Sequence, residues 1–521
     1  MKTHAVKTFV LAAALVTLAL APGAAPALAD GFPIKAVPIP SQSPAAEVPR
    51  FIGQPAVAHR VSAPAIPTNP WMGPAPWNNV HNDTYMSDTY PGSGPLGVSP
   101  SVVSTYLQRG LGPIALVAVM TVDQWGNLVA GAITSPDGVG SSMLRLTLLD
   151  PVTLDQLAAI DLPKEQLESQ KARPSGDYFY SDQLGRTVIG TPERTIWIVS
   201  HRQTASGWEF THDPADDVDL TSVIAAGDKI QSLQPDFKGR IWVTTKGGTV
   251  CTVDAQGGKV LGAADDIAVL GERIANSHAA GDEGGVYIAS TKALYRFDAD
   301  RFGRPEVTWR AVYGSGDRIK PGQVDVGTGT TPTLMGSKYV TISDNADPYM
   351  HVLVYKRAKR VSGKRLVAKV PVFKAYKGSN ENSLVATDHS IIVENNYGYR
   401  DQQVDTTGGR TTLPGLARID LDEHGRAHKV WTSYKVSIPS VISKLSLRNG
   451  LIYSYTKPAG PGTTDRWYFT AVDFRTGKTV WRQLAGTGFL YDNDYAGTYL
   501  GPTGTFYVGV NGGVVAMRDG Q

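Results

Sequence analysis

The sequence has little of what would support a disulfide-bonded, helical or nucleic-acid-binding protein. Its single cysteine, Cys251, cannot form a disulfide within the chain, so stability must come from burial of a core. Long amphipathic stretches with helical periodicity do not occur. The formal net charge is only +3 over 521 residues. This near-neutral balance argues against nucleic acid or an anionic membrane as the main partner.

The familiar catalytic and cofactor motifs are also missing. The chain has no Gly-x-Ser-x-Gly nucleophile elbow, no His-Glu-x-x-His zinc motif and no haem-attachment motif. Two runs, Asp298-Ala299-Asp300 and Asp420-Leu421-Asp422, resemble the start of a calcium loop but lack the distal Glu. Both follow an apolar strand-like run, which favours hairpin turns. Because the haem-attachment motif is missing, we expect no haem. Function must then be sought in the arrangement of ordinary polar residues.

One long apolar run is present, and it lies at the N-terminus. Lys2 and Lys7 precede the run Phe9–Ala21, and Ala27-Leu28-Ala29 provides small residues for cleavage. This pattern is typical of a secretory signal peptide and is too short for a membrane span. Residues 1–29 are therefore predicted to be removed near Asp30, which places the protein outside the cytoplasm, either secreted or periplasmic. The alternative is a buried apolar helix.

Residues 30–99 are rich in proline and poor in charge up to about residue 76. Proline removes a backbone donor and interrupts helices and central strands. We therefore predict an extended arm or linker ahead of the folded domain.

From about residue 100 the chain repeats a turn of the form Asp-x-x-Gly between apolar strands. Asp accepts hydrogen bonds from the backbone two residues on, and Gly supplies a positive φ, which is the chemistry of a hairpin. Successive turns lie roughly 45–60 residues apart, the length of a four-stranded propeller blade. The turns or their looser copies occur at Asp123, Asp182, Asp236, Asp282, Gly336, Asp388, Asn449 and Gly504.

A second turn follows in most units, and several units end in Trp, at Trp309, Trp431 and Trp481. Two hairpins per unit predict four strands. The fold class is therefore all-β, a β-propeller of about eight (seven to eight) four-stranded blades over residues 100–521. The last unit has only three strands, and a segment near Val102–Leu107 is predicted to supply the fourth and close the ring. The alternative is a β-sandwich or two separate β-domains.

The run Asp473-Phe474-Arg475-Thr476-Gly477-Lys478-Thr479-Val480-Trp481 resembles the repeat of quinoprotein-like propellers. The resemblance implies pyrroloquinoline quinone (PQQ) as a cofactor and a dehydrogenase activity. Alcohol dehydrogenases of that kind commonly carry a disulfide between adjacent cysteines, which Cys251 alone cannot form. A quinone-dependent dehydrogenase is therefore the last of the alternatives.

Propeller geometry places the start of each innermost strand, the loop between strands two and three, and the link between blades on one face. In units four to eight these positions are unusually polar, as expected for a ligand-binding funnel. His278 and His81 are the candidates for a general base on this face. The predicted ligand-binding residues are Asp83, Glu394, Asn395, Lys444 and Asn493.

A second resemblance is to the gluconolactonase/paraoxonase-like propellers, through Asn276, Asp282, Gly285, the run 286–289 and Asp344-Asn345. In that family a calcium ion at the central opening polarises an ester or lactone carbonyl. The resemblance implies Asn276, Asp344, Asn345 and Asn382 as calcium ligands, with oxygen atoms that suit a hard cation. The sequence departs from that family in its number of units and in lacking a recognisable Glu ligand in the first blade. The alternative is that these residues cap loops.

Three functions follow. The first is an exported metal-dependent hydrolase that acts on an ester or lactone of a small molecule in the funnel. The second is a non-catalytic propeller that binds a small ligand or a protein there. The third is the quinone-dependent dehydrogenase.

Overall fold

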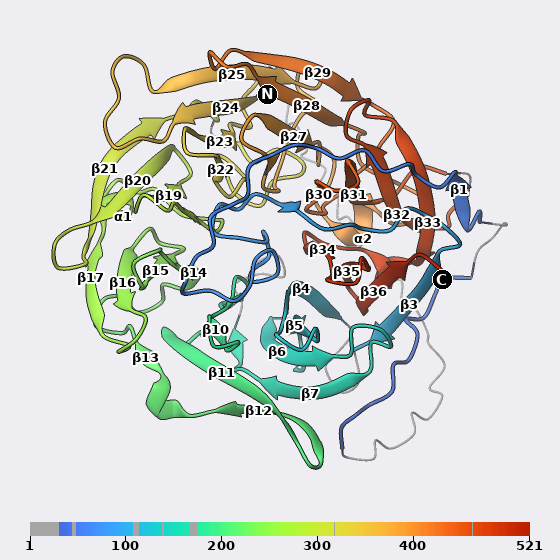
Figure 1. Cartoon of the computed structure of the whole chain (residues 1–521), viewed down its shortest axis with the longest axis horizontal. Coiled ribbons are helices and arrows are strands. Elements are labelled where there is room, and N and C mark those ends of the chain that lie inside the picture. The colour runs from blue at the N-terminus through green and yellow to red at the C-terminus, as the bar shows by residue number, and fades with distance from the viewer. Residues whose placement is uncertain are drawn as a thin grey trace, which may run out of the picture.

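Eight sheets are arranged as blades around a central channel (Figure 1). Five have four strands, and the other three add one or two short strands to the four of the blade. This computed structural model describes residues 31–43, 48–107, 114–137, 140–166, 174–316, 318–460 and 462–520. The predicted signal peptide, residues 1–29, lies outside that range. The prediction of an all-β propeller of about eight blades is confirmed.

Each of the first four blades is an antiparallel meander whose first strand is innermost. Blade 1 is β4 (Ala115–Val122), β5 (Leu128–Thr134), β6 (Ser141–Leu149) and β7 (Gln156–Asp161); blade 2 is β9 (Tyr180–Ser181), β10 (Thr187–Gly190), β11 (Thr195–Thr204) and β12 (Gly207–His212); blade 3 is β14 (Ile230–Pro235), β15 (Arg240–Thr245), β16 (Val250–Asp254) and β17 (Val260–Ala264); blade 4 is β18 (Ala279–Ala280), β19 (Val286–Ala289), β20 (Ala293–Ala299) and β21 (Pro305–Val312).

The remaining four blades follow the same order, and the last is completed from the other end of the chain. Blade 5 is β22 (Thr333–Met335), β23 (Tyr339–Ser343), β24 (Met350–Lys356) and β25 (Leu366–Val372); blade 6 is β26 (Val385–Ala386), β27 (Ser390–Glu394), β28 (Leu416–Leu421) and β29 (Ala427–Ser433); blade 7 is β30 (Lys444–Ser446), β31 (Leu451–Thr456), β32 (Arg466–Asp473) and β33 (Thr479–Thr487); blade 8 is β34 (Thr498–Leu500), β35 (Phe506–Val510), β36 (Gly513–Arg518) and β3 (Ser101–Tyr106).

β3 pairs with β36 over its whole length, from Ser101 opposite Arg518 to Tyr106 opposite Gly513. The predicted closing strand is therefore confirmed. Short elements complete the described chain: β1 (Phe51–Gly53), β2 (Thr89–Tyr90), β8 (Glu165–Gln166), β13 (Val218–Asp219), the helices α1 (Asp266–Val269) and α2 (Gln402–Asp405), and 3-10 turns at Pro214–Asp216 and Phe489–Tyr491. Within the described residues, no helix is long and apolar enough to cross a membrane.

The Asp-x-x-Gly turns join the first and second strands, as predicted, and three of the four clear copies share the same hydrogen bonds. In each, the Asp carboxylate accepts backbone N–H groups two and four residues on, as Asp236 does from Lys238 and Arg240. The glycines have positive φ, for example 79° at Gly239, a conformation that favours glycine.

The fourth copy, predicted at Asp282–Gly285, is shifted by one residue. The turn runs from Gly281 to Gly284, closed by hydrogen bonds between Gly281 and Gly285 and between Gly284 and Gly281. The Asp282 carboxylate is thereby free of the turn, and it accepts hydrogen bonds from the Tyr85 hydroxyl at 2.5 Å and from Arg357 at 3.0 Å. The prediction of the turn type was wrong here because tertiary partners compete for the carboxylate.

Burial follows the blade pattern. The middle strands are the most completely buried, as in β15, β19 and β31, and Trp481 on an outer strand is fully buried between blades. Cys251 on β16 is also fully buried and free, which confirms that it packs as a small apolar residue. The core is thus distributed between neighbouring blades, so each blade depends on the next for burial of its faces.

The proline-rich arm does not remain outside the ring. Its later part, residues 69–90, runs through the central channel at the end where the innermost strands finish (Figure 1). It forms at least one hydrogen bond with every blade: Trp77 O with Val122 N, Asn78 O with Ser181 N, the Asn69 side chain with Pro235 O, Thr84 O with Ala280 N, Tyr85 O with Leu334 N, Ser87 O with Ala386 N, Asp88 O with Leu445 N, and the Trp77 indole with Leu500 O. We call residues 69–90 the plug.

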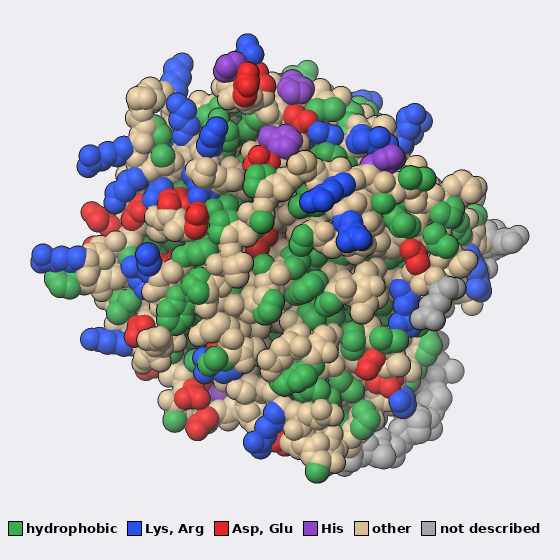
Figure 2. Space-filling model, in the orientation of Figure 1, with side chains coloured by type: hydrophobic (Ala, Val, Ile, Leu, Met, Phe, Trp, Pro, Cys, Tyr) green, Lys and Arg blue, Asp and Glu red, His purple; other side chains and the backbone are tan. Residues whose placement is uncertain are grey.

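Figure 2 shows one face of the molecule. Charged side chains gather mainly around its rim and upper half, and the middle is largely hydrophobic or uncharged.

Candidate functional site

The plug closes the channel at one end and leaves a funnel at the other. The hollow has a volume of about 70 Å³, and all eight blades and the plug contribute to its wall. We define the funnel by its lining residues: Val80, His81, Ala118, Val119, Asp177, Tyr178, Gln231, Ala275, Asn276, Val324, Gly329, Thr331, Glu381, Asn382, Ser383, Ile442 and Tyr495. Most of them come just before, or at the start of, an innermost strand. The face predicted to bind a ligand is therefore the face that carries the funnel.

The floor of the funnel is a compact double turn, residues 79–89, held by its own side chains. The Asn79 side chain accepts the backbone N–H of His81 at 2.8 Å, and Asp83 accepts the backbone N–H of Tyr85 at 2.9 Å and the Ser87 hydroxyl at 2.6 Å. Three residues, Asn82, Met86 and Asp88, have positive φ. Short polar side chains that bond to the nearby backbone explain why this segment forms turns and not a strand.

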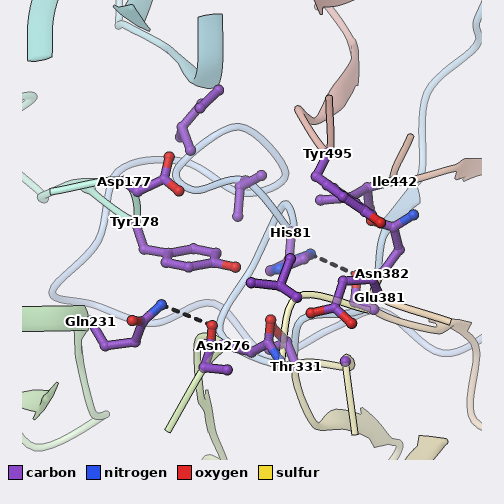
Figure 3. A pocket seen from close by; sticks show the side chains of 17 residues that line it. His81, Asp177, Tyr178, Gln231, Asn276, Thr331, Glu381, Asn382, Ile442 and Tyr495 are labelled. Atoms are coloured by element: carbon purple, nitrogen blue, oxygen red, sulfur yellow. Dashed lines mark hydrogen bonds between the residues drawn. The ribbon is translucent and has the colours of Figure 1, made fainter. Parts of the chain in front are cut away.

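His81 is 1% exposed and lies in the middle of the funnel, facing Tyr178, Asn276 and Glu381 (Figure 3). Its Nδ1 is 3.2 Å from both carboxylate oxygens of Asp88 and 2.9 Å from the Ser383 hydroxyl. Its Nε2 is buried and has no hydrogen-bond partner among the described residues. One ring nitrogen is thus held by the protein, and the other is available to whatever enters the funnel.

Asp88 connects His81 to a buried cation. Lys444 forms an ion pair with Asp88, and its ammonium also donates to the carbonyl of Val80 at 2.6 Å. Burial opposes the charge on Asp88, but the neighbouring Lys444 and His81 hold the pKa of its carboxyl below the usual value. Lys444 does not line the funnel, so it stabilises Asp88 from behind.

Glu394 is the other buried carboxyl beside the funnel wall. The Asn382 side chain donates to one of its oxygens at 2.5 Å, and the Ser443 hydroxyl contacts the other at 2.6 Å. Burial raises the pKa of Glu394 to about 8. At neutral pH the folded protein therefore holds a protonated carboxyl at this position.

We expect Glu394→Gln to change the pH dependence of stability. The pKa of Glu394 is higher in the folded chain than in the unfolded chain, so between about pH 4.5 and 8 the folded state binds more protons and stability falls as pH rises. The neutral amide removes this loss, flattening the slope by up to about 1.4 kcal/mol per pH unit. Urea unfolding at pH 5, 6.5 and 8 measures it. The exposed Glu423→Gln is the control, and equal slopes in wild type and Glu394→Gln would contradict the assignment.

The predicted site residues divide into two groups. His81, Asn276 and Asn382 line the funnel. His278 is fully buried, with Nδ1 2.8 Å from the Ser232 hydroxyl, and burial lowers the pKa of its imidazole to about 3. It does not line the funnel. Asp83, Glu394, Asn395, Lys444 and Asn493 are buried and bonded to neighbouring protein groups, so they build the wall and floor behind the lining.

Of the four residues implied as calcium ligands, two line the funnel and two are bonded to neighbouring protein groups. Asp344 accepts two backbone N–H groups and lies 2.8 Å from His351 Nδ1, and the Asn345 side chain bonds to Gly327 and Asn380. Only Asn276 and Asn382 of the four reach the funnel. Across the described residues, no three His, Cys, Asp or Glu side chains are grouped to hold a metal. Calcium binding by these residues therefore stays a prediction.

Sequence reasoning overlooked part of the lining, notably Asp177, Tyr178 and Gln231. They occupy in blades 2 and 3 the positions that Asn276 occupies in blade 4, close to the start of the innermost strand. Their equivalent positions in the repeat could have predicted them, but the predicted site included only units four to eight.

Comparisons with known proteins place the chain among propellers. No family model matches. An uncharacterized protein of Archaeoglobus fulgidus is 29% identical over 325 residues, which cover 56% of this chain and 62% of the archaeal protein. The match thus spans less than two thirds of that relative's length.

Among solved structures, the quinohemoprotein alcohol dehydrogenase of Comamonas testosteroni is similar with a TM-score of 0.52 and 11% identity, covering 87% of this chain and 81% of that one. The corresponding dehydrogenase of Pseudomonas putida gives 0.49 and 12%, covering 85% and 80%, and BamB of Moraxella catarrhalis gives 0.42 and 11%, covering 81% and 98%. The likeness to the Comamonas testosteroni structure shows a β-propeller fold. The gluconolactonase/paraoxonase-like resemblance finds no support among these structures.

Proposed function

We propose that this chain is an exported β-propeller that binds a small, hydrogen-bonding molecule in the funnel. The observation that carries the proposal is the unpaired Nε2 of buried His81, which faces the hollow. A buried polar atom without a partner costs free energy, and a bound molecule that donates a hydrogen bond recovers it. Amide and hydroxyl groups of Gln231, Asn276 and Thr331 surround the same space.

The funnel does not fit PQQ. That cofactor is a planar tricarboxylate, and such an anion calls for cationic side chains and a flat aromatic surface. The described lining contains no Lys, Arg or Trp, and it includes the carboxylates Asp177 and Glu381. Cys251, as the single cysteine, forms no disulfide. The lining therefore favours a binding propeller over a quinone-dependent dehydrogenase.

Closing the mouth of the funnel tests the proposal. Val324 is 47% exposed and lines the funnel, so Val324→Trp is expected to obstruct entry without disturbing the core. A panel of polyols, sugar lactones and amino acids is screened by thermal unfolding and calorimetry. A ligand at 100 times its Kd stabilises the folded protein by about 2.7 kcal/mol, and we expect Val324→Trp to weaken its binding by roughly tenfold or more.

The matched control is Val269→Trp at an 80% exposed position on α1, outside the funnel. It should bind the same ligand as wild type does. Equal binding by Val324→Trp and wild type would place the ligand elsewhere and contradict the proposal. The absence of any binding across the panel would also count against it.

A further inference from the structure

The hydrogen bonds of His81 determine which of its nitrogens can accept a proton. Asp88, as a carboxylate, can only accept hydrogen bonds, so Nδ1 must carry the hydrogen that lies between them. Nε2 is then the unprotonated nitrogen, with its lone pair directed to the funnel. A carboxylate that fixes the tautomer of an imidazole is the arrangement that general-base catalysis requires.

Ser383 is beside His81 but on the wrong side to be its nucleophile. Its hydroxyl lies 2.9 Å from Nδ1 and donates to Asp88. A serine activated by this imidazole would have to approach Nε2, where the described residues offer no hydroxyl within hydrogen-bond distance. Water is therefore the nucleophile that the funnel can supply to Nε2.

Tyr178 stands across the funnel, and its hydroxyl end points toward His81 (Figure 3). It is placed by the start of blade 2, whereas His81 is placed by the plug, so the two groups are held by separate parts of the fold. A phenolic hydroxyl donates hydrogen bonds to a carbonyl oxygen and strengthens them as charge develops on that oxygen. A base and a donor that face each other suit a carbonyl compound placed between them.

We propose that the funnel hydrolyses a small uncharged ester or lactone without a metal, with His81 as the general base. His81 Nε2 takes a proton from water as the water oxygen bonds to the carbonyl carbon, and the Tyr178 hydroxyl donates to the carbonyl oxygen. The carbon–oxygen bond to the leaving alkoxide oxygen then breaks, and His81 returns the proton to that oxygen. An ester gives one carboxylic acid and one alcohol, and a lactone gives a single hydroxy acid. The proposal rests on the proposed function, because it uses the same funnel.

Hydrolysis of p-nitrophenyl acetate and of δ-valerolactone tests the proposal. General-base catalysis contributes about 10²- to 10⁴-fold to a rate, so we expect His81→Asn to lower kcat/KM by roughly 100-fold or more. Tyr178→Phe should lower it by roughly tenfold. Free imidazole itself cleaves the nitrophenyl ester, and for that reason the control is His424→Asn, which removes a surface imidazole on the β28–β29 turn and should leave the rate unchanged.

Rescue separates catalysis from a structural role. Added imidazole is expected to raise the hydrolysis rate of His81→Ala at least tenfold. It should not raise the rate of Val324→Trp. Equal rates in His81→Asn and wild type would overturn the proposal, and so would a wild-type rate no higher than that of buffer with both esters. If hydrolysis is absent but a panel ligand binds wild type and binds Val324→Trp more weakly, only the hydrolysis proposal is contradicted. If neither binding nor hydrolysis occurs, the proposed function falls with it.

Discussion

A chain that starts at Pro91 is expected to lose cooperative folding, even though it keeps β3 and all eight blades. It lacks the plug, which forms hydrogen bonds with every blade and buries Tyr85, Met86 and Tyr90 almost completely. Burial of each such side chain contributes about 1.5–3 kcal/mol to the free energy of unfolding. Removal of the plug also leaves its hydrogen-bond partners on the blades unpaired. The total loss exceeds about 5 kcal/mol, the scale of the stability of a whole domain. Circular dichroism and urea unfolding measure it.

Two further samples make this prediction specific. A chain that starts at Gln54 loses β1 but keeps the plug, and we expect it to unfold cooperatively. A synthetic peptide of residues 69–90, added to the chain that starts at Pro91, should restore a cooperative transition. An undiminished urea midpoint for the chain that starts at Pro91 would show that the plug is not part of the stabilising structure.

Replacing Asp88 with Asn is expected to destabilise the fold by about 3–5 kcal/mol. The substitution leaves the fully buried ammonium of Lys444 without its counter-charge and replaces one of the two acceptor oxygens beside His81 Nδ1 with an amide donor. The partner substitution, Lys444→Met, should cost a similar amount because it leaves the buried Asp88 carboxylate without its cation. Urea unfolding at pH 7 gives both free energies.

The double variant Asp88→Asn/Lys444→Met provides the control for this pair. Because it buries neither charge, its loss of stability should be smaller than the sum of the two single losses. Additive losses would mean that the two groups do not interact in the folded state. The Arg202–Glu209 pair on the exposed β11–β12 hairpin offers a comparison, for which removal of one partner should cost at most about 1 kcal/mol.

Much of the architecture could be read from local chemistry. Each first turn lies where a short polar segment separates two apolar runs, and all eight positions became the turn between the first and second strands. The closing strand was predicted because the last repeat has three strands and an unpaired edge must be covered. Such signals are local in sequence, so a single chain suffices to detect them.

The candidate site was harder to predict from the sequence than the fold. The run His81–Asp88 was recognised as polar, yet its place inside the channel depends on hydrogen bonds to residues as distant as Leu334 and Leu445. Nothing in the composition of residues 30–99 distinguishes a free arm from a plug. Likewise, His278 and Asn276 are two residues apart, but one is buried between blades and the other faces the funnel.

The sequence by itself therefore determined the repeat, a blade number of seven to eight and the strand that closes the ring, and it indicated a face on which polar residues gather. These depend on periodicity and on turn chemistry, which act within a few residues. Only the tertiary structure decided that the arm fills the channel, that Asp88 holds one nitrogen of His81 while the other is left without a partner among the described residues, and that Lys444 is a buried partner instead of a ligand contact. Those outcomes depend on which distant backbone and side-chain groups meet when eight blades close around one segment.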